Sequence, residues 1–189
     1  MGTSLTAGAA WVDALSATLE PLIGRPVRVL NFGKAGATSR SGLETVDEVI
    51  VARPDMAIIE FGINDAGLHR HITLAESAVN LAAIVARLRA AIAEVRLFLM
   101  TMSPAIGLHA WLRPRLGRYY EVYQDLSERE RVGLIDNRPH WKAMPRRELA
   151  RALPDGRHVI PEYALSITLE NVVRTIVRDY GVLSCVQAR

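Results

Sequence analysis

The chain has 189 residues, of which 50% are hydrophobic and 23% are charged. This composition suits one domain with a buried core and excludes a disordered chain, a collagen-like repeat and a coiled coil. The single cysteine, Cys185, excludes an intrachain disulfide and a cysteine-based zinc site. Arg87 and Arg89 interrupt the longest apolar run, so no run reaches the roughly 18 residues that a membrane span needs. We therefore expect one domain over residues 1–189 and no membrane span.

The formal charge of +3 is concentrated in residues 113–157, where arginines interleave with aromatic residues. Such interleaving is found on nucleic-acid-binding surfaces. This segment also contains many acidic residues and has no RNA- or DNA-binding motif, so we expect a solvated helical face and no nucleic-acid partner. No basic residue precedes Arg25, so the positively charged start of a secretory signal is absent and we expect a cytoplasmic protein.

Short β-rich runs alternate with amphipathic helices along the chain. The runs are Val27–Asn31, Met56–Glu60, Leu97–Thr101 and a weaker one at Val132–Ile135. Ser41 and Glu44 have the spacing of a capping box, which predicts that a helix begins at Ser41. An apolar stripe after Thr73 predicts a long second helix, and Pro161 marks the start of the last one. Alternation of this kind indicates an α/β fold with a parallel sheet, in which ligands bind at the carboxyl ends of the strands.

Glycine and polar residues cluster at the start of the chain and after these runs. Four blocks are found in order: Gly2–Thr6 (GTSLT), Asn31–Gly36 (NFGKAG), Gly62–Asp65 (GIND) and Asp155–His158 (DGRH). Together they resemble the four ordered blocks of the SGNH, or GDSL, hydrolases, and the resemblance covers almost the whole chain. It implies a three-layer α/β/α sandwich of the flavodoxin-like SGNH hydrolase fold, and a serine esterase that uses neither a metal nor an organic cofactor.

The first and fourth residues of the last block have the chemistry that an activated serine requires. A serine hydroxyl needs an adjacent base, and the base needs an acceptor that orients it. Asp155 and His158, three residues apart around Gly156, can fold so that the carboxylate reaches Nδ1 while Nε2 points outward. By resemblance, Ser4 is the nucleophile, His158 the base and Asp155 the residue that orients the base.

A tetrahedral oxyanion needs fixed hydrogen-bond donors. The resemblance assigns this task to the backbone N–H groups of Ser4 and Gly36 and to the side-chain amide of Asn64. A glycine at position 36 leaves room for an acyl group, and an asparagine supplies an N–H that an aspartate lacks.

Each block has a structural alternative when it is taken alone. Ser4 could be a helix N-cap, Gly33 and Gly36 could simply turn the chain, Asn64-Asp65 could form an Asx turn, and Asp155-Gly156 is a common turn dipeptide. The four blocks at compatible spacing favour the catalytic interpretation.

The other histidines are weaker candidates. His69 and His71 form an H-x-H pair, but no carboxylate or cysteine supports a metal site at a suitable spacing, so we expect a surface loop. His109 and His140, which lie near Trp111 and Trp141, could border an acyl or sugar pocket, although packing within loops is the simpler interpretation.

Three features depart from the family pattern. Thr3 replaces the aspartate of the Gly-Asp-Ser block, and Val159 replaces the usual proline after the histidine. The family also has a central strand before the serine, whereas only three residues precede Ser4 here. We therefore expect four strands from this chain and a fifth encoded upstream of Met1. The alternative is a true truncation, which would give a pseudoenzyme or a chain completed by a partner.

The expected function is hydrolysis of carboxylic esters through an acyl-enzyme on Ser4, with a small-molecule ester as substrate. Short acyl esters and O-acetylated carbohydrates are the first candidates. A lysophospholipase or thioesterase of the same family, a catalytically impaired binding domain and a nucleic-acid-associated protein are the alternatives.

Overall fold

The computed structural model describes the backbone of residues 1–187 and the side chains of residues 1–179, so that the side chain of Cys185 lies outside the described part. In chain order its elements are α1 (Ser4–Ala7), α2 (Ala10–Ile23), α3 (Ser39–Ala52), β1 (Met56–Ile59), α4 (Gly62–Asp65), the 3₁₀ turn η1 (Leu68–Arg70), α5 (Leu74–Ala91), β2 (Arg96–Met100), α6 (Gly107–Trp111), α7 (Leu116–Glu130), β3 (Gly133–Ile135), α8 (Arg138–Ala143), α9 (Arg146–Ala152), α10 (Pro161–Tyr163), the π-helical segment η2 (Ala164–Leu169) and α11 (Glu170–Gln187).

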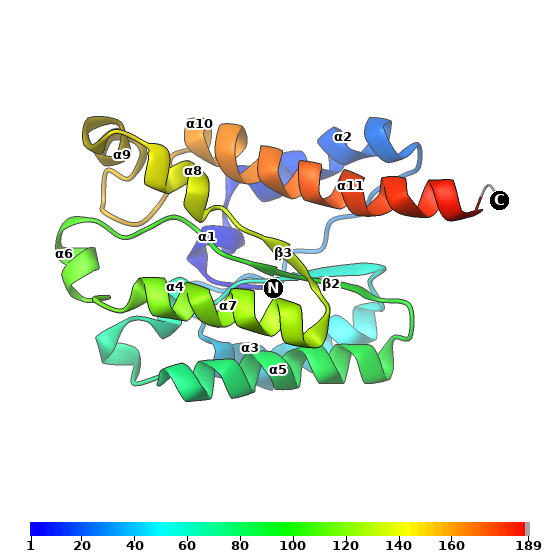
Figure 1. Ribbon diagram of the computed structural model, residues 1–189, viewed down its shortest axis with the longest axis horizontal. Helices are drawn as coiled ribbons and strands as arrows, with labels where there is room; N and C mark the ends of the chain where they lie inside the picture. Colours follow the sequence, from blue (N-terminus) through cyan, green and yellow to red (C-terminus); the bar gives the residue numbers. More distant parts are fainter. Residues whose placement is uncertain (188–189) are drawn as a thin grey trace.

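The strands form a parallel sheet in the order β1-β2-β3, with Met56 opposite Arg96 and Phe98 opposite Gly133. Helices α2 and α11 cover one face, whereas α3 and α5 cover the other (Figure 1). This arrangement confirms the predicted α/β class and three-layer architecture. Within the described part of the chain, no helix is both long enough and apolar enough to cross a membrane.

Alternate residues of each strand supply the two cores. Phe98 and Met100 of β2 pack in the core under α2 and α11, whereas Leu97 and Leu99 pack in the core under α3 and α5. A strand that is buried on both faces is apolar at nearly every position, which explains why these runs could be recognised in the sequence.

The predicted strand at Val27–Asn31 is wrong, because this segment is irregular in the structure. A strand needs a neighbour along its length. In the stretch before Ser4 only one residue forms ladder bridges: Gly2 is bridged to Gly33 on one side and to Glu60 on the other. The Glu60 N–H donates to Met1 O at 3.1 Å, and the Lys34 N–H donates to Gly2 O at 2.9 Å. Within the described residues, the sheet therefore has three strands instead of the expected four.

A cavity of about 390 Å³ lies beside this irregular segment. Its lining comes from the segment itself, from β1 and from the helices, and includes Val27, Val29, Met56, Ile58 and Leu15. The cavity thus occupies the space between the segment and the sheet edge, and residues of α2 and of α3 both line it.

The helix boundaries follow recognisable caps, with one correction. Thr73 caps α5 by accepting a hydrogen bond from the Glu76 N–H at 3.1 Å, and Pro161 begins α10 as predicted. Helix α3, however, begins at Ser39 with Thr38 as the N-cap, and Ser41 is the third residue of its capping box. The capping box with Ser41 as N-cap is therefore wrong, because Thr38 provides the same cap one turn earlier.

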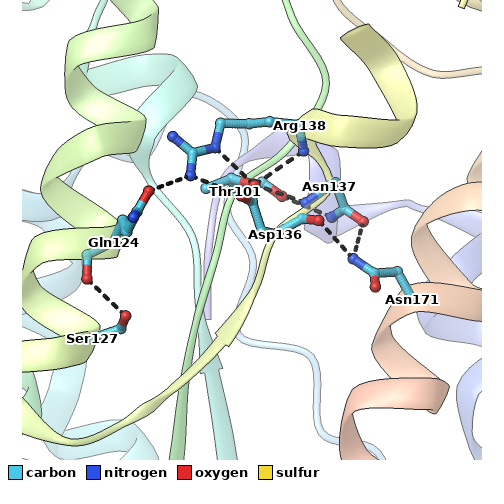
Figure 2. A network of polar contacts seen from close by, with 7 residues as sticks. All are labelled: Thr101, Gln124, Ser127, Asp136, Asn137, Arg138 and Asn171. Carbon is cyan, nitrogen blue, oxygen red and sulfur yellow. Dashed lines mark hydrogen bonds and ion pairs between the residues drawn. The ribbon is translucent and has the colours of Figure 1, made fainter. Parts of the chain in front are cut away.

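A polar network ties β2 and β3 to the surrounding helices at their carboxyl ends (Figure 2). Thr101 donates to Asp136 Oδ1 at 2.7 Å, and Arg138 binds both oxygens of Asp136. Asn171 of α11 donates to Asp136 O and to Asn137 Oδ1, each at 3.0 Å. Because the charges of Asp136 and Arg138 are matched within this network, we interpret it as structural support for the loops at this end of the sheet.

Candidate active site

Ser4, His158 and Asp155 form a continuous hydrogen-bonded chain. Ser4 Oγ lies 2.9 Å from His158 Nε2, and His158 Nδ1 lies 2.5 Å from Asp155 Oδ2. Ser4 is the first residue of α1, whereas the other two lie in the loop between α9 and α10. The structure therefore brings together residues that are more than 150 positions apart in the sequence, in the order that nucleophilic catalysis requires.

The loop that carries Asp155 and His158 is fixed by its own backbone. The N–H groups of Arg157 and His158 donate to Asp155 Oδ1 at 3.0 and 2.8 Å. Gly156 has φ of +88°, and a β-carbon there would lie 2.8 Å from Ile106 O, so this position needs glycine. Partial burial opposes ionisation of Asp155, but the two backbone N–H donors and the imidazole outweigh it and hold the pKa of this carboxyl well below its usual range. Asp155 therefore stays ionised and can orient the imidazole.

The first turn of α1, which contains Ser4, is held by the buried carboxylate of Glu60, a residue that was not identified as functional from the sequence. The N-cap of α1 is Thr3, so Ser4 is not an N-cap and its side chain is free to meet His158. Glu60, at the end of β1, accepts hydrogen bonds on Oε1 from the Thr3 N–H, the Thr3 hydroxyl and the Thr6 hydroxyl at 2.7–2.8 Å. Burial raises the pKa of Glu60 to about 7, although these donors oppose the shift. The sequence did contain a signal for this role, because Glu60 is a single acidic residue at the end of the apolar run Met56–Glu60.

Gly36 and Asn64 flank the same end of the sheet. Gly36 precedes α3 and has φ of +77°, a left-handed conformation that favours glycine. Asn64 is 1% exposed, and its Nδ2 donates to Ala37 O at 2.8 Å, which ties the amide to the Gly36 loop and leaves its second hydrogen unused by that bond. Within the described residues, the backbone N–H groups of Ser4 and Gly36 make no hydrogen bond to the protein. Asn64 and Asp65 lie in α4 and not in an isolated Asx turn.

Three arginines surround these loops, and none of them was singled out from the sequence. They are Arg70 of η1, Arg113 before α7 and Arg157 of the catalytic loop. Arg113 is 3% exposed, contrary to the solvated face expected for residues 113–157. Four aromatic residues near or within that segment, Tyr119, Tyr120, Tyr123 and Trp141, are also buried, whereas Trp111 is 71% exposed.

The remaining histidines lie near the arginines or apart from the site. His69 lies in η1, and burial together with Arg70, Arg113 and Arg157 lowers its pKa. His109 lies beside Gly156, because a β-carbon there would lie 3.2 Å from the imidazole. The described side chains contain no group of three or more His, Cys, Asp or Glu residues that could hold a metal ion.

Comparisons with known proteins matched one family model and several solved structures. A model of the GDSL-like lipase/acylhydrolase family matches residues 1–162. A lipase/acylhydrolase from Enterococcus faecalis is 26% identical, with a TM-score of 0.79 over 95% of this chain and 93% of that one. The acetylxylan esterase Axe2 from Geobacillus stearothermophilus is 22% identical, with a TM-score of 0.72 over 95% and 91%.

TesA is 24% identical, with a TM-score of 0.72 over 93% of this chain and 96% of that one. The similarity to Axe2 and TesA shows a shared fold. A search of curated proteins gave no match. Because the family model covers most of the sequence and all four blocks, the chain belongs to the GDSL-like lipase/acylhydrolase family and is a hydrolase that acts on ester bonds.

Proposed function

We propose that this chain is a serine esterase that hydrolyses carboxylic esters through an acyl-enzyme on Ser4. The observation that carries the proposal is the hydrogen-bonded chain from Ser4 Oγ through His158 to Asp155. Such a chain allows the imidazole to remove the hydroxyl proton while the carboxylate stabilises the resulting imidazolium.

The first half of the reaction forms the acyl-enzyme. His158 Nε2 takes the proton of Ser4 Oγ as the oxygen attacks the ester carbonyl. The negative charge that develops on the carbonyl oxygen is stabilised by the N–H groups of Ser4 and Gly36 and by the amide of Asn64. The tetrahedral intermediate then expels the alcohol, which receives the proton from His158, and the acyl group remains on Ser4.

The second half releases the acid. A water molecule gives its proton to His158 as it attacks the acyl carbonyl, and the second tetrahedral intermediate is stabilised by the same donors. Its collapse returns the proton to Ser4 Oγ and frees the carboxylic acid. Each step uses only this chain's side chains, its backbone N–H groups and water.

Short acyl esters and O-acetylated carbohydrates are the substrates that we propose first. The side chains of His158 and Asp155 are 37% and 50% exposed, so the site is open to an alcohol group of considerable size. The fold shared with an acetylxylan esterase supports the same choice.

The test is hydrolysis of p-nitrophenyl acetate by matched variants. Ser4→Ala removes the nucleophile and should reduce the rate to near background, and Asp155→Asn should lower kcat by about 10²–10⁴ because the imidazolium loses its charged partner. Ser166→Ala is the control, since this exposed hydroxyl donates only to Glu162 O in the preceding turn. Full activity in the Ser4→Ala variant would refute the proposal.

A further inference from the structure

Among the described residues, the guanidinium groups of two of the three arginines around the site have no partner. Arg70 Nε and Arg157 Nε are buried without a hydrogen bond, and neither guanidinium forms an ion pair within the described part of the chain. Elsewhere, arginines such as Arg40, Arg87 and Arg138 pair with carboxylates. Buried donors without acceptors cost stability, so an unmatched pair of cations at one place needs an explanation.

The arginines border the three backbone segments that form the candidate site. A β-carbon on Gly36 would lie 3.1 Å from Arg70 Nη2, so this guanidinium covers the Gly36 loop. Arg113 Nε donates to Ile63 O at 2.7 Å, next to Asn64. Arg157 immediately precedes His158 in the loop that carries the base.

Within the described part of the chain, no carboxylate forms an ion pair with Arg70 or Arg157. Asp155 is the acidic residue closest in sequence to Arg157, and its two oxygens are already engaged by His158 and by backbone N–H groups. The arginines also act on one another: besides burial, the charges of Arg157 and Arg70 lower the pKa of Arg113. The region is therefore positively charged, and it includes the residue that immediately precedes His158.

We infer that the preferred substrate is an ester that carries a carboxylate or phosphate group, which Arg70 and Arg157 bind beside the scissile ester. This inference rests on the proposed function, because it names the substrate class of the same site. Guanidinium groups match the planar geometry of carboxylates and phosphates, and hydrogen bonds between charged groups are stronger than neutral ones. An anion held there would supply acceptors for both guanidinium groups and would fix the ester relative to Ser4.

The first experiment compares three acetate esters that differ in one group: 4-acetoxybenzoate, 4-acetoxyphenyl phosphate and methyl 4-acetoxybenzoate. Each kcat/KM is divided by the rate constant of hydroxide-catalysed hydrolysis, which corrects for leaving-group reactivity. We expect an anionic ester to exceed the neutral one by about tenfold or more, and the better of the two anions distinguishes carboxylate from phosphate. A second pair, mono-4-nitrophenyl adipate and its methyl ester, tests an anion on the acyl side.

Variants then connect the preference to the arginines. Arg70→Gln and Arg157→Gln should each reduce the ratio of anionic to neutral kcat/KM by about tenfold, and added salt should reduce it in the wild type. Arg118→Gln is the matched control, because it removes one positive charge from an exposed face of α7 and should keep the ratio. A ratio near one in the wild type for both pairs would overturn the inference, as would a ratio that neither arginine substitution changes.

A binding measurement separates failure of this inference from failure of the proposed function. In a Ser4→Ala background, calorimetry measures the affinity for 4-hydroxybenzoate and for phenyl phosphate with and without Arg70→Gln. If the wild type hydrolyses none of the esters, the proposed function fails. Loss of anion affinity in the arginine variant would still support the anion site, and an equal or absent affinity would overturn it.

Discussion

The side-chain amide of Asn64 has two hydrogens with different tasks. One is donated to Ala37 O at 2.8 Å and fixes the orientation of the amide, which is almost completely buried. The other remains for the oxyanion in the mechanism proposed above. A donor that is fixed before the reaction costs no reorganisation when the charge develops, which is why such groups contribute strongly to rate.

Replacement of Asn64 separates this task from substrate binding. Asn64→Ala should lower kcat for p-nitrophenyl acetate by about 10²–10³ while KM stays within a fewfold, because the lost hydrogen bond is made chiefly in the transition state. Asn64→Asp should be slower still, since it places negative charge beside a developing anion. Steady-state kinetics and thermal melts of both variants distinguish a catalytic loss from a folding defect. Equal rates for the two variants would argue against an oxyanion role.

Single residues differ in how well the sequence revealed them. Ser4, Asp155 and His158 were recognisable because they lie in short blocks with a fixed order, and the structure brings these three side chains together. Arg70 and Arg157 were not recognisable, because they are 87 positions apart and share no spacing with each other. Only the folded chain shows that both guanidinium groups lack partners in its described part.

At the scale of elements, Glu60 connects α1 to the end of β1. Three hydrogen bonds from Thr3 and Thr6 converge on its Oε1, whereas its Oε2 is buried without a partner. The position of Ser4 at the first turn of α1 therefore depends on a carboxyl group that burial favours in its neutral form.

The pKa of Glu60 predicts how stability changes with pH. Its pKa is about 7 in the folded chain, but about 4.3 for an unfolded glutamate. Because the folded value is raised, the stabilisation is complete below pH 4.3 and is lost as the pH rises through 7. The free energy of unfolding of the wild type should thus fall relative to Glu60→Gln by about 2–4 kcal/mol between pH 4.5 and 7.5.

Urea denaturation at several pH values measures this difference. The buried Met1 amino group interacts with the charge of Glu60, so the comparison reports on Glu60 together with this interaction. Glu44→Gln, an exposed substitution in α3, is the control and should follow the wild type. Parallel pH profiles for the wild type and Glu60→Gln would show that Glu60 ionises normally.

Strands could be predicted where the residues of the run itself indicated burial within the sheet. Met56–Glu60, Leu97–Thr101 and Val132–Ile135 correspond closely to β1, β2 and β3, because burial on both faces leaves a dense apolar run. Val27–Asn31 is also rich in β-formers but forms no strand, because among the described residues only Gly2 forms a ladder bridge nearby, to Gly33. Whether a run pairs depends on the neighbouring segment, and the composition of the run alone does not reveal whether such a neighbour exists.

At the scale of the whole molecule, the sheet lacks pairing along one edge of β1. The cavity of about 390 Å³ lies at that edge, and Met1 and Gly2 contact the sheet only at the end nearest Ser4. Added apolar residues that continue this stretch away from Ser4 would fill the cavity and pair with β1. Burial of two or three aliphatic side chains and the new ladder hydrogen bonds would both stabilise the domain.

An N-terminal extension tests this expectation. Val-Val-Val-Leu-Ala placed before Met1 should raise Tm by roughly 5–10 °C and should raise kcat, because Ser4 would follow a fixed strand. A Gly-Ser extension of the same length is the control, since it cannot fill the cavity with side chains. Equal melting temperatures for the two extensions would show that the edge of β1 does not accept a strand.

Covalent labelling shows directly whether Ser4 is an activated nucleophile. The wild-type chain is treated with a fluorophosphonate and measured by intact mass spectrometry, and the adduct is then located by peptide mapping. If Ser4 is the activated nucleophile, we expect one adduct, on the peptide that contains Ser4, and none on the Ser4→Ala variant. An unlabelled wild type, or an adduct on Ser39, Ser41 or Ser103, would contradict it.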